Sequence, residues 1–269
     1  LKGLSAALAR VEGAYAVVLV DTREPDTIYG CRVSSPLVMG EGQGGNYLGS
    51  DIPAFLPYTR RVVFLEDGEI VRLTPGAWHL FDSKLTPVDR EPQTITWNIQ
   101  AAQKGGHKHF MIKEIFEQPK VITDCISGRI RESASGSEVA LPELDGLDVP
   151  ERLHIIACGT SFHAGLWGMH LLESWANIPV SVEIASEFRY RDAILGERDA
   201  VLVISQSGET ADTLAGLRKV KAMGIPVIGL CNVVGSSIAR ESDMVVYTQA
   251  GPEISVASTK AMCSQLTLL

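Results

Sequence analysis

The spacing of apolar residues divides the chain into a strand-rich first third and a later part in which strands alternate with helices. The opening residues 1–15 have the spacing of a helix already under way. VVFLEDGEIVRL (62–73) places Asp67-Gly68 between two β-rich runs and therefore predicts a hairpin. Other short apolar runs punctuated by Pro, Gly or Asp predict strands: 14–21, 27–33, 36–40 and 46–51. The first third is therefore expected to be a layered β sheet or part of one.

A polar stretch with Pro and paired Gly follows, from about Ser83 to Lys108, and has the composition of a linker, whose centre we place at 97–108. Residues 109–130 then predict a helix, with Pro119 expected to end it or to start a second one. The apolar residues that give this helical spacing are Met111, Ile112, Ile115 and Phe116. Residues 131–150 have the composition of a loop.

From Leu153 onward, apolar runs alternate with helical segments of 10 to 15 residues. Because these runs are apolar on both faces, they predict a parallel sheet that helices cover on both sides. Right-handed crossovers then give a doubly wound, three-layer αβα domain, so the fold class is α/β. The predicted strands are 153–159, 179–185, 200–205, 226–231 and 243–248, and the longer predicted helices are about 161–175 and 209–223.

Composition narrows the classes of function. The chain has 269 residues, of which 45% are hydrophobic and 21% charged, as in globular proteins. A net charge of −8 argues against nucleic acid as a partner, and no apolar run approaches the roughly 20 residues that cross a membrane. Five scattered cysteines without a CxxC pattern indicate reduced thiols in the cytoplasm rather than disulfides or a zinc site.

Three strand ends carry loops of one style, CGTS (158–161), SQSGET (205–210) and VASTK (256–260). In a doubly wound sheet, ligands bind beyond the carboxyl ends of the strands. The unpaired N–H groups and the dipole of a helix N-terminus attract an anion there. Ser and Thr hydroxyls add donors, and glycine allows close approach of the backbone. The three loops therefore predict a phosphate site built without cations.

The alternative for each loop is that its hydroxyl residues are only helix N-caps. Three such loops on one sheet edge favour a binding site over three separate caps. The chain has no GxxxxGK[ST] P-loop, and GTSFHAG (159–165) lacks the glycine pair of a dinucleotide-binding fold. A small phosphorylated ligand is therefore expected rather than a nucleotide.

These segments together resemble the glucosamine-6-phosphate synthase family, the isomerising glutamine–fructose-6-phosphate aminotransferases. The resemblance extends over essentially the whole chain, and the residues that carry it are CGTS, EIASEFRYR (183–191), SQSGETADTLAGLR (205–218), CNVVGSS (231–237), VASTKA (256–261) and KEIFEQP (113–119). The family joins a glutaminase of the Ntn-hydrolase type to two sugar isomerase (SIS) domains. The resemblance implies that residues 1–96 are the C-terminal part of a glutaminase domain, 97–108 a linker, and 109–269 the first SIS domain with its leading helices.

The resemblance also implies the ligand and the residues that bind it. Glutamine-derived ammonia is transferred to fructose 6-phosphate to give glucosamine 6-phosphate in hexosamine biosynthesis, without metal or organic cofactor, in an enzyme that is a homodimer at full length. The residues that match the family's sugar-phosphate site are Ser205, Gln206, Ser207 and Thr210 in the second loop, Thr160 and Ser161 in the first, and Val256 and Ser258 in the third.

The family's catalytic groups have no counterpart in this chain. The glutaminase nucleophile is an N-terminal cysteine, whereas residue 1 is Leu1, and the catalytic Lys, Glu and His belong to a segment beyond Leu269. We therefore expect a piece of a longer protein, with no catalytic residue of its own and no synthase activity when isolated. Glutamine would bind only in the longer protein.

Two further classes of protein remain as alternatives: a SIS-domain sensor of sugar phosphates, and a phosphosugar isomerase or deglycase without a glutaminase. The strand-rich region before residue 97 argues for the aminotransferase.

Two charged residues near the loops are expected not to act in catalysis. Lys260 is expected to be structural or a neighbour of the phosphate, and Glu209 to point away from the ligand.

Overall fold

The computed structural model describes residues 1–95, 104–133 and 136–269. The chain forms two compact units, Leu1–Ala102 and Gln103–Leu269, and each is described by itself. Most of the predicted linker, residues 97–103, lies outside the described residues. No helix in the described part of the chain has the length and apolar character needed to span a bilayer.

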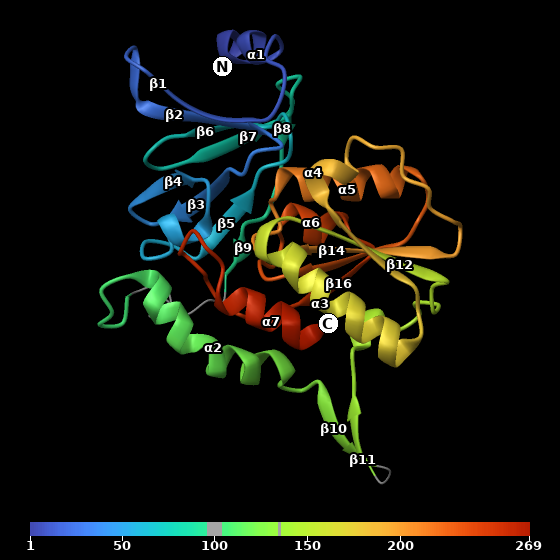
Figure 1. Ribbon diagram of the computed structural model, residues 1–269. Helices are drawn as coiled ribbons and strands as arrows, with labels where there is room; N and C mark the ends of the chain where they lie inside the picture. The colour runs from blue at the N-terminus through green and yellow to red at the C-terminus, as the bar shows by residue number, and fades with distance from the viewer. Residues whose placement is uncertain (96–103, 134–135) are drawn as a thin grey trace. The chain divides into compact units, whose positions relative to one another are not determined.

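The first unit is a pair of antiparallel sheets (Figure 1). One sheet has the order β1-β2-β6-β7-β8 and the other β4-β3-β5-β9. The elements are helix α1 (Lys2–Leu8), the short helix η1 (Ile52–Ala54) and strands β1 (Tyr15–Asp21), β2 (Glu24–Val33), β3 (Val38–Gly42), β4 (Gly45–Gly49), β5 (Arg61–Phe64), β6 (Ile70–Leu73), β7 (Trp78–Phe81), β8 (Pro87–Val88) and β9 (Gln93–Thr94). The four strand predictions before residue 52 are thus confirmed.

The two sheets enclose a common apolar core. Met39 and Val63 come from one sheet, and Val71, Leu73 and Leu80 come from the other, each at most 2% exposed. Alternation along the strands places these side chains on the inner faces. The outer strand β1 differs, because apolar side chains are exposed on both of its faces: Val18 at 54% on one face and Leu19 at 38% on the other.

The predicted hairpin over residues 62–73 is wrong. Its two strands, β5 and β6, form where expected but belong to different sheets. The Asp67-Gly68 turn is tied to the end of β2: Gly68 N donates to the Arg32 carbonyl at 2.8 Å, and Asp67 Oδ1 accepts from Ser34 N at 2.8 Å. These bonds direct β6 to pair with β2, and a local turn signal cannot reveal such a long-range partner.

The second unit contains a five-stranded parallel sheet and its helices. Its elements are helices α2 (Phe110–Ile126), α3 (Gly159–Ala176), α4 (Ala185–Phe188), α5 (Ala211–Ala222), α6 (Ser237–Glu241) and α7 (Lys260–Leu268), the short helix η3 (Pro142–Leu144), and strands β10 (Ile130–Ser133), β11 (Gly136–Val139), β12 (Arg152–Ala157), β13 (Val180–Ile184), β14 (Asp199–Ser205), β15 (Val227–Cys231) and β16 (Met244–Tyr247). The parallel α/β prediction is confirmed, with strand order β13-β12-β14-β15-β16.

Two predictions before this sheet are wrong. The stretch 131–150 is not only loop, because β10 and β11 pair as an antiparallel two-stranded sheet. All of β11 is exposed, so no apolar alternation marks it in the sequence. Helix α2 also continues through Pro119. Pro119 is exposed, and the opposite face of α2 packs along α7, where the two helices lie side by side (Figure 1). This packing outweighs the single hydrogen bond that proline removes.

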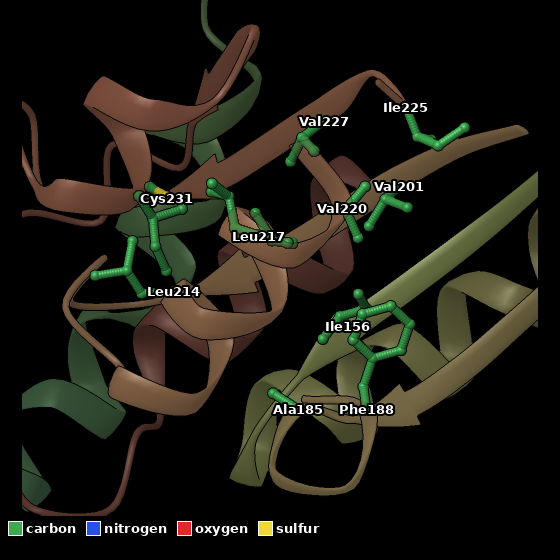
Figure 2. Packing of buried hydrophobic residues seen from close by; sticks show 12 residues of the cluster. Ile156, Ala185, Phe188, Val201, Leu214, Leu217, Val220, Ile225, Val227 and Cys231 are labelled. Carbon is green, nitrogen blue, oxygen red and sulfur yellow. The ribbon is translucent and has the colours of Figure 1, made fainter. Parts of the chain in front are cut away.

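Both faces of the parallel sheet are buried, as the uniformly apolar strands predict. Alternate residues serve opposite faces: Ile156 and Val203 join one core with α4 and α5, and Ile155 and Ile204 join the other with α3 and α7. Figure 2 shows the first core, where the ring of Phe188 lies against Ile156. Helices therefore cover both sides, and the unit is a three-layer αβα domain.

The contribution of this core can be tested with one substitution at two sites. Ile156 is fully buried, so Ile156→Ala should lower the free energy of unfolding by about 2–5 kcal/mol through lost burial and a cavity. Ile194 is 86% exposed, so Ile194→Ala should change it by less than about 0.5 kcal/mol. Urea unfolding followed by circular dichroism measures both. Similar losses in the two variants would contradict this packing.

Candidate functional site

The first two predicted loops meet at the point where the strand order reverses. β12 is the first strand of the sheet, and its neighbours are β13 on one side and β14 on the other. The parallel register pairs Ala157 with Ile204, so the loops that follow β12 and β14 leave the sheet side by side. Thr213 Oγ1 of α5 also contacts Cys158 Sγ at 3.9 Å. Doubly wound sheets bind their ligands at this reversal.

The second loop is folded around its own hydroxyl groups. Ser205 is 2% exposed, and its Oγ accepts from Gly208 N at 3.0 Å and lies 2.9 Å from Thr210 Oγ1. Ser207 Oγ accepts from Glu209 N at 3.2 Å. The turn thus leads directly into α5, with Thr210 as its N-cap residue. Gln206, Ser207 and Thr210 each keep part of their surface exposed, so a ligand has access to them.

Gly208 is the residue that lets this loop approach the next one. Its φ is +66°, in the left-handed region, and an added Cβ would lie 1.9 Å from Ser236 Oγ. The Gly208 carbonyl also accepts from Ile238 N, at 2.9 Å, in the first turn of α6. Position 208 therefore requires glycine for both conformation and space.

Glu209 points into α6, as predicted for a residue that does not face the ligand. Its carboxylate accepts from Ser237 N at 2.7 Å and from Ser237 Oγ at 2.8 Å. Here an internal carboxylate satisfies donors at the start of a short helix. The sequence places Glu209 beside the loop, but its side chain serves the neighbouring segment.

The first loop begins α3 two residues earlier than predicted. The helix starts at Gly159 with Cys158 as N-cap, so Thr160 and Ser161 lie within its first turn. Thr160 is partly exposed and Ser161 is buried. Neither α3 nor α5 has its first N–H groups bonded by an N-cap side chain. The simple N-cap interpretation therefore does not account for the hydroxyl residues of these two loops.

The third loop is built differently, because an internal carboxylate occupies the N-terminus of α7. Glu253 Oε1 accepts from Thr259 N at 2.8 Å and from Ala261 N at 3.2 Å. The helix N-terminus that we expected to attract phosphate is thus already bonded to an anion. Val256 is fully exposed, whereas Ser258 Oγ is buried without a hydrogen-bond partner among the described residues.

Asn232 connects the second loop to the segment that leads into the third. Its backbone N donates to the Gln206 carbonyl at 3.3 Å, and its Nδ2 donates to the Gly251 carbonyl at 2.7 Å. Asn232 Oδ1 accepts from Thr248 Oγ1 at 3.0 Å and from Ala250 N at 2.8 Å. Sequence reasoning missed this residue, although it lies in the quoted CNVVGSS segment directly after β15.

Two arginines of the EIASEFRYR segment, Arg189 and Arg191, are paired with carboxylates. Arg189 Nη1 donates to Asp212 Oδ1, in the first turn of α5, at 2.8 Å, and this hydrogen bond raises the pKa of Arg189. Arg191 Nε donates to Glu183 Oε2 at 2.6 Å. The arrangement is therefore suited to hold a small anion with helix N–H groups and hydroxyls.

The chain is similar in sequence to proteins of known family. Residues 147–269 match the SIS domain family. A glutamine–fructose-6-phosphate aminotransferase (isomerizing) of Thermus thermophilus is 48% identical over 269 residues, which is 100% of this chain and 44% of that protein. The protein of the same name from Clostridium acetobutylicum is 46% identical over 264 residues, 97% of this chain and 43% of its own length.

One solved structure adds to this similarity. The C-terminal domain of the glucosamine-fructose-6-phosphate aminotransferase from Francisella tularensis is 43% identical, with a TM-score of 0.57, over 61% of this chain and 47% of its own. The predicted family resemblance is thus confirmed. The chain spans less than half the length of the curated relatives that it matches.

The role of Gly208 can be separated from backbone strain by a matched glycine. Gly208→Ala and Gly224→Ala both place a side chain at positive φ, which costs roughly 1–2 kcal/mol. Only Gly208→Ala also clashes with Ser236, so it should lose about 1–3 kcal/mol more, while position 224 is open. Thermal unfolding of both variants measures the difference. Equal losses would show that the clash does not exist.

Proposed function

We propose that this chain is the sugar-phosphate-binding part of a glutamine–fructose-6-phosphate aminotransferase. It carries a SIS domain, and along its whole length it is homologous to a segment of these enzymes. The observation that supports this most directly is the meeting of two helix N-termini without side-chain caps at the reversal of the sheet. Hydroxyl residues lie at the start of each of these helices, a combination suited to a phosphate.

In this proposal, each loop has its own part in binding fructose 6-phosphate. The second loop (Ser205, Gln206, Ser207 and Thr210) and the first (Thr160 and Ser161) hold the phosphate. Val256 and Ser258 of the third loop face the carbon chain of the sugar. Ser205 is 2% exposed, so its hydroxyl orients Gly208 N and Thr210 as much as it serves the ligand.

The longer enzyme, in this proposal, transfers glutamine-derived ammonia to fructose 6-phosphate and releases glucosamine 6-phosphate, in the cytoplasm and as a homodimer. Residues 1–96 are the C-terminal part of a glutaminase domain of the Ntn-hydrolase type, 97–108 the linker, and 109–269 the first SIS domain. The whole-chain similarity to aminotransferases, which includes the two facing sheets of the first unit, supports this division over a sensor or an isomerase. No catalytic residue or cofactor is assigned to this chain.

Two alanine substitutions test the loop assignment. Ser207→Ala and Thr210→Ala each remove a hydroxyl from the phosphate site, and losing one hydrogen bond to a charged ligand costs roughly 1.5–3 kcal/mol. The affinity for fructose 6-phosphate, measured by isothermal titration calorimetry, should therefore fall about 10- to 150-fold in each variant.

Thr267→Ala is the control, because Thr267 Oγ1 donates to the Cys263 carbonyl within α7, away from the loops. It should bind the sugar phosphate as tightly as the unsubstituted chain. Unchanged affinity in both Ser207→Ala and Thr210→Ala, with intact folding by circular dichroism, would refute the assignment of the phosphate to the second loop.

A further inference from the structure

Helix α2, which packs against α7, carries a buried carboxylate, Glu114, and a partly buried one, Glu117, beside the third loop. Glu114 is 1% exposed, and it is bonded to residues 140 and 141 positions away in the sequence. Glu114 Oε1 accepts from Ile254 N at 2.7 Å and from Ser255 N at 3.2 Å, and Glu114 Oε2 accepts from Ser255 Oγ. One side chain thus satisfies several donors at the start of the loop.

A second set of charges fixes the end of the same loop. Lys260 is 2% exposed, and its Nζ donates to Glu117 Oε2 at 2.8 Å, while Lys113 Nζ lies 3.1 Å from Glu117 Oε1. Burial by itself raises the pKa of Glu117, but the hydrogen bonds and charges of the two lysines outweigh it and leave that pKa below its ordinary value. Lys260 therefore has a structural role.

Between these anchors, the loop presents two different groups. Val256 is fully exposed, and Ser258 Oγ is buried with no partner in the described part of the chain. The N–H groups at the start of α7 are bonded to Glu253, and Glu114 and Glu117 lie on the adjoining face of α2. Lys113 and Lys260 offset the charge of Glu117, but Glu253 and Glu114 already occupy the N–H groups that a phosphate would need at the third loop. The loop is therefore better suited to neutral hydroxyl groups than to a phosphate.

We infer that Glu114 is a positioning residue, which holds the third loop so that Val256 and Ser258 select the polyhydroxylated carbon chain of the ligand, independently of its phosphate. This inference rests on the proposed function, which assigns the phosphate to the first two loops. The selectivity for sugar phosphate over phosphate alone then depends on a carboxylate that does not touch the ligand. Removing the Glu114 carboxylate is expected to weaken binding of the sugar part of the ligand and to leave binding of its phosphate unchanged.

The test compares two ligands in the 269-residue chain, fructose 6-phosphate and inorganic phosphate. Glu114→Gln keeps the shape of the side chain but turns an NH₂ group toward the donors of Ser255, and loses the charge that strengthens these bonds. Calorimetry should show about a tenfold or greater loss of affinity for fructose 6-phosphate and less than about a twofold change for inorganic phosphate.

Three further measurements separate positioning from general damage. Amide hydrogen exchange of residues 254–259 should speed up in Glu114→Gln without ligand, while exchange in β12 and β14 stays unchanged. Ser255→Ala, which removes one donor to Glu114, should have a smaller effect of the same kind. Glu197→Gln, an exposed residue just before β14, should change neither affinity nor exchange.

Several results would overturn the inference. Unchanged fructose 6-phosphate affinity in Glu114→Gln would do so, as would equal losses for both ligands, which indicate a general structural role. Unchanged exchange of residues 254–259 would show that Glu114 does not hold the loop. If the unsubstituted chain bound neither ligand, the proposed function itself would fail, whereas a binding chain with an unaffected Glu114→Gln variant would refute the positioning role alone.

Discussion

The parallel pairing of β12 with β14 is the constraint on which the rest of the second unit depends. It brings the ends of two strands, separated by almost 50 residues of sequence, to adjacent positions at one edge, with Ala157 beside Ile204. The helices that follow must start there, because each strand is buried on both faces and the chain can leave only beyond its end. The edge therefore collects helix N-termini, whatever residues form the loops, and the sequence decides what fills them.

The N–H groups at the helix N-termini of this edge are treated in two different ways in this protein. At α3 and α5 the first-turn N–H groups have no side-chain cap, whereas at α7 the chain supplies its own anion, Glu253. The first arrangement leaves hydrogen-bonding capacity for a ligand, and the second uses it to fix the loop. Asn232 connects these two regions through its backbone and both atoms of its amide, so the edge is held as one hydrogen-bonded layer.

Local sequence patterns predicted the features that depend on local chemistry. Apolar runs identified the strands of both units, and the hydroxyl-rich loops were found at the strand ends. Two failures involve partners distant in sequence: β6 pairs with β2 instead of β5, and α2 continues through Pro119 because α7 supports it. Two others are local: β10 and β11 pair although the exposed strand β11 has no apolar alternation, and the nearby Glu253 fills the start of α7. The apolar residues Met111, Ile112, Ile115 and Phe116 indicated a helix correctly, yet they are exposed, and the buried face carries Lys113 and Glu114. Periodicity reveals a helix but not which of its faces finds a partner.

The outer strand β1 has a practical consequence for handling the protein. Its run of aliphatic residues is held by β2 on one side only, and Val18 and Val20 remain more than half exposed. A strand of this composition at the margin of a sheet is a template for pairing with another extended chain. In this 269-residue chain, β1 is therefore open to pairing with another extended chain. A charged residue in place of Val18 or Val20 would oppose such pairing, and both positions belong to a different unit from the hydroxyl-rich loops.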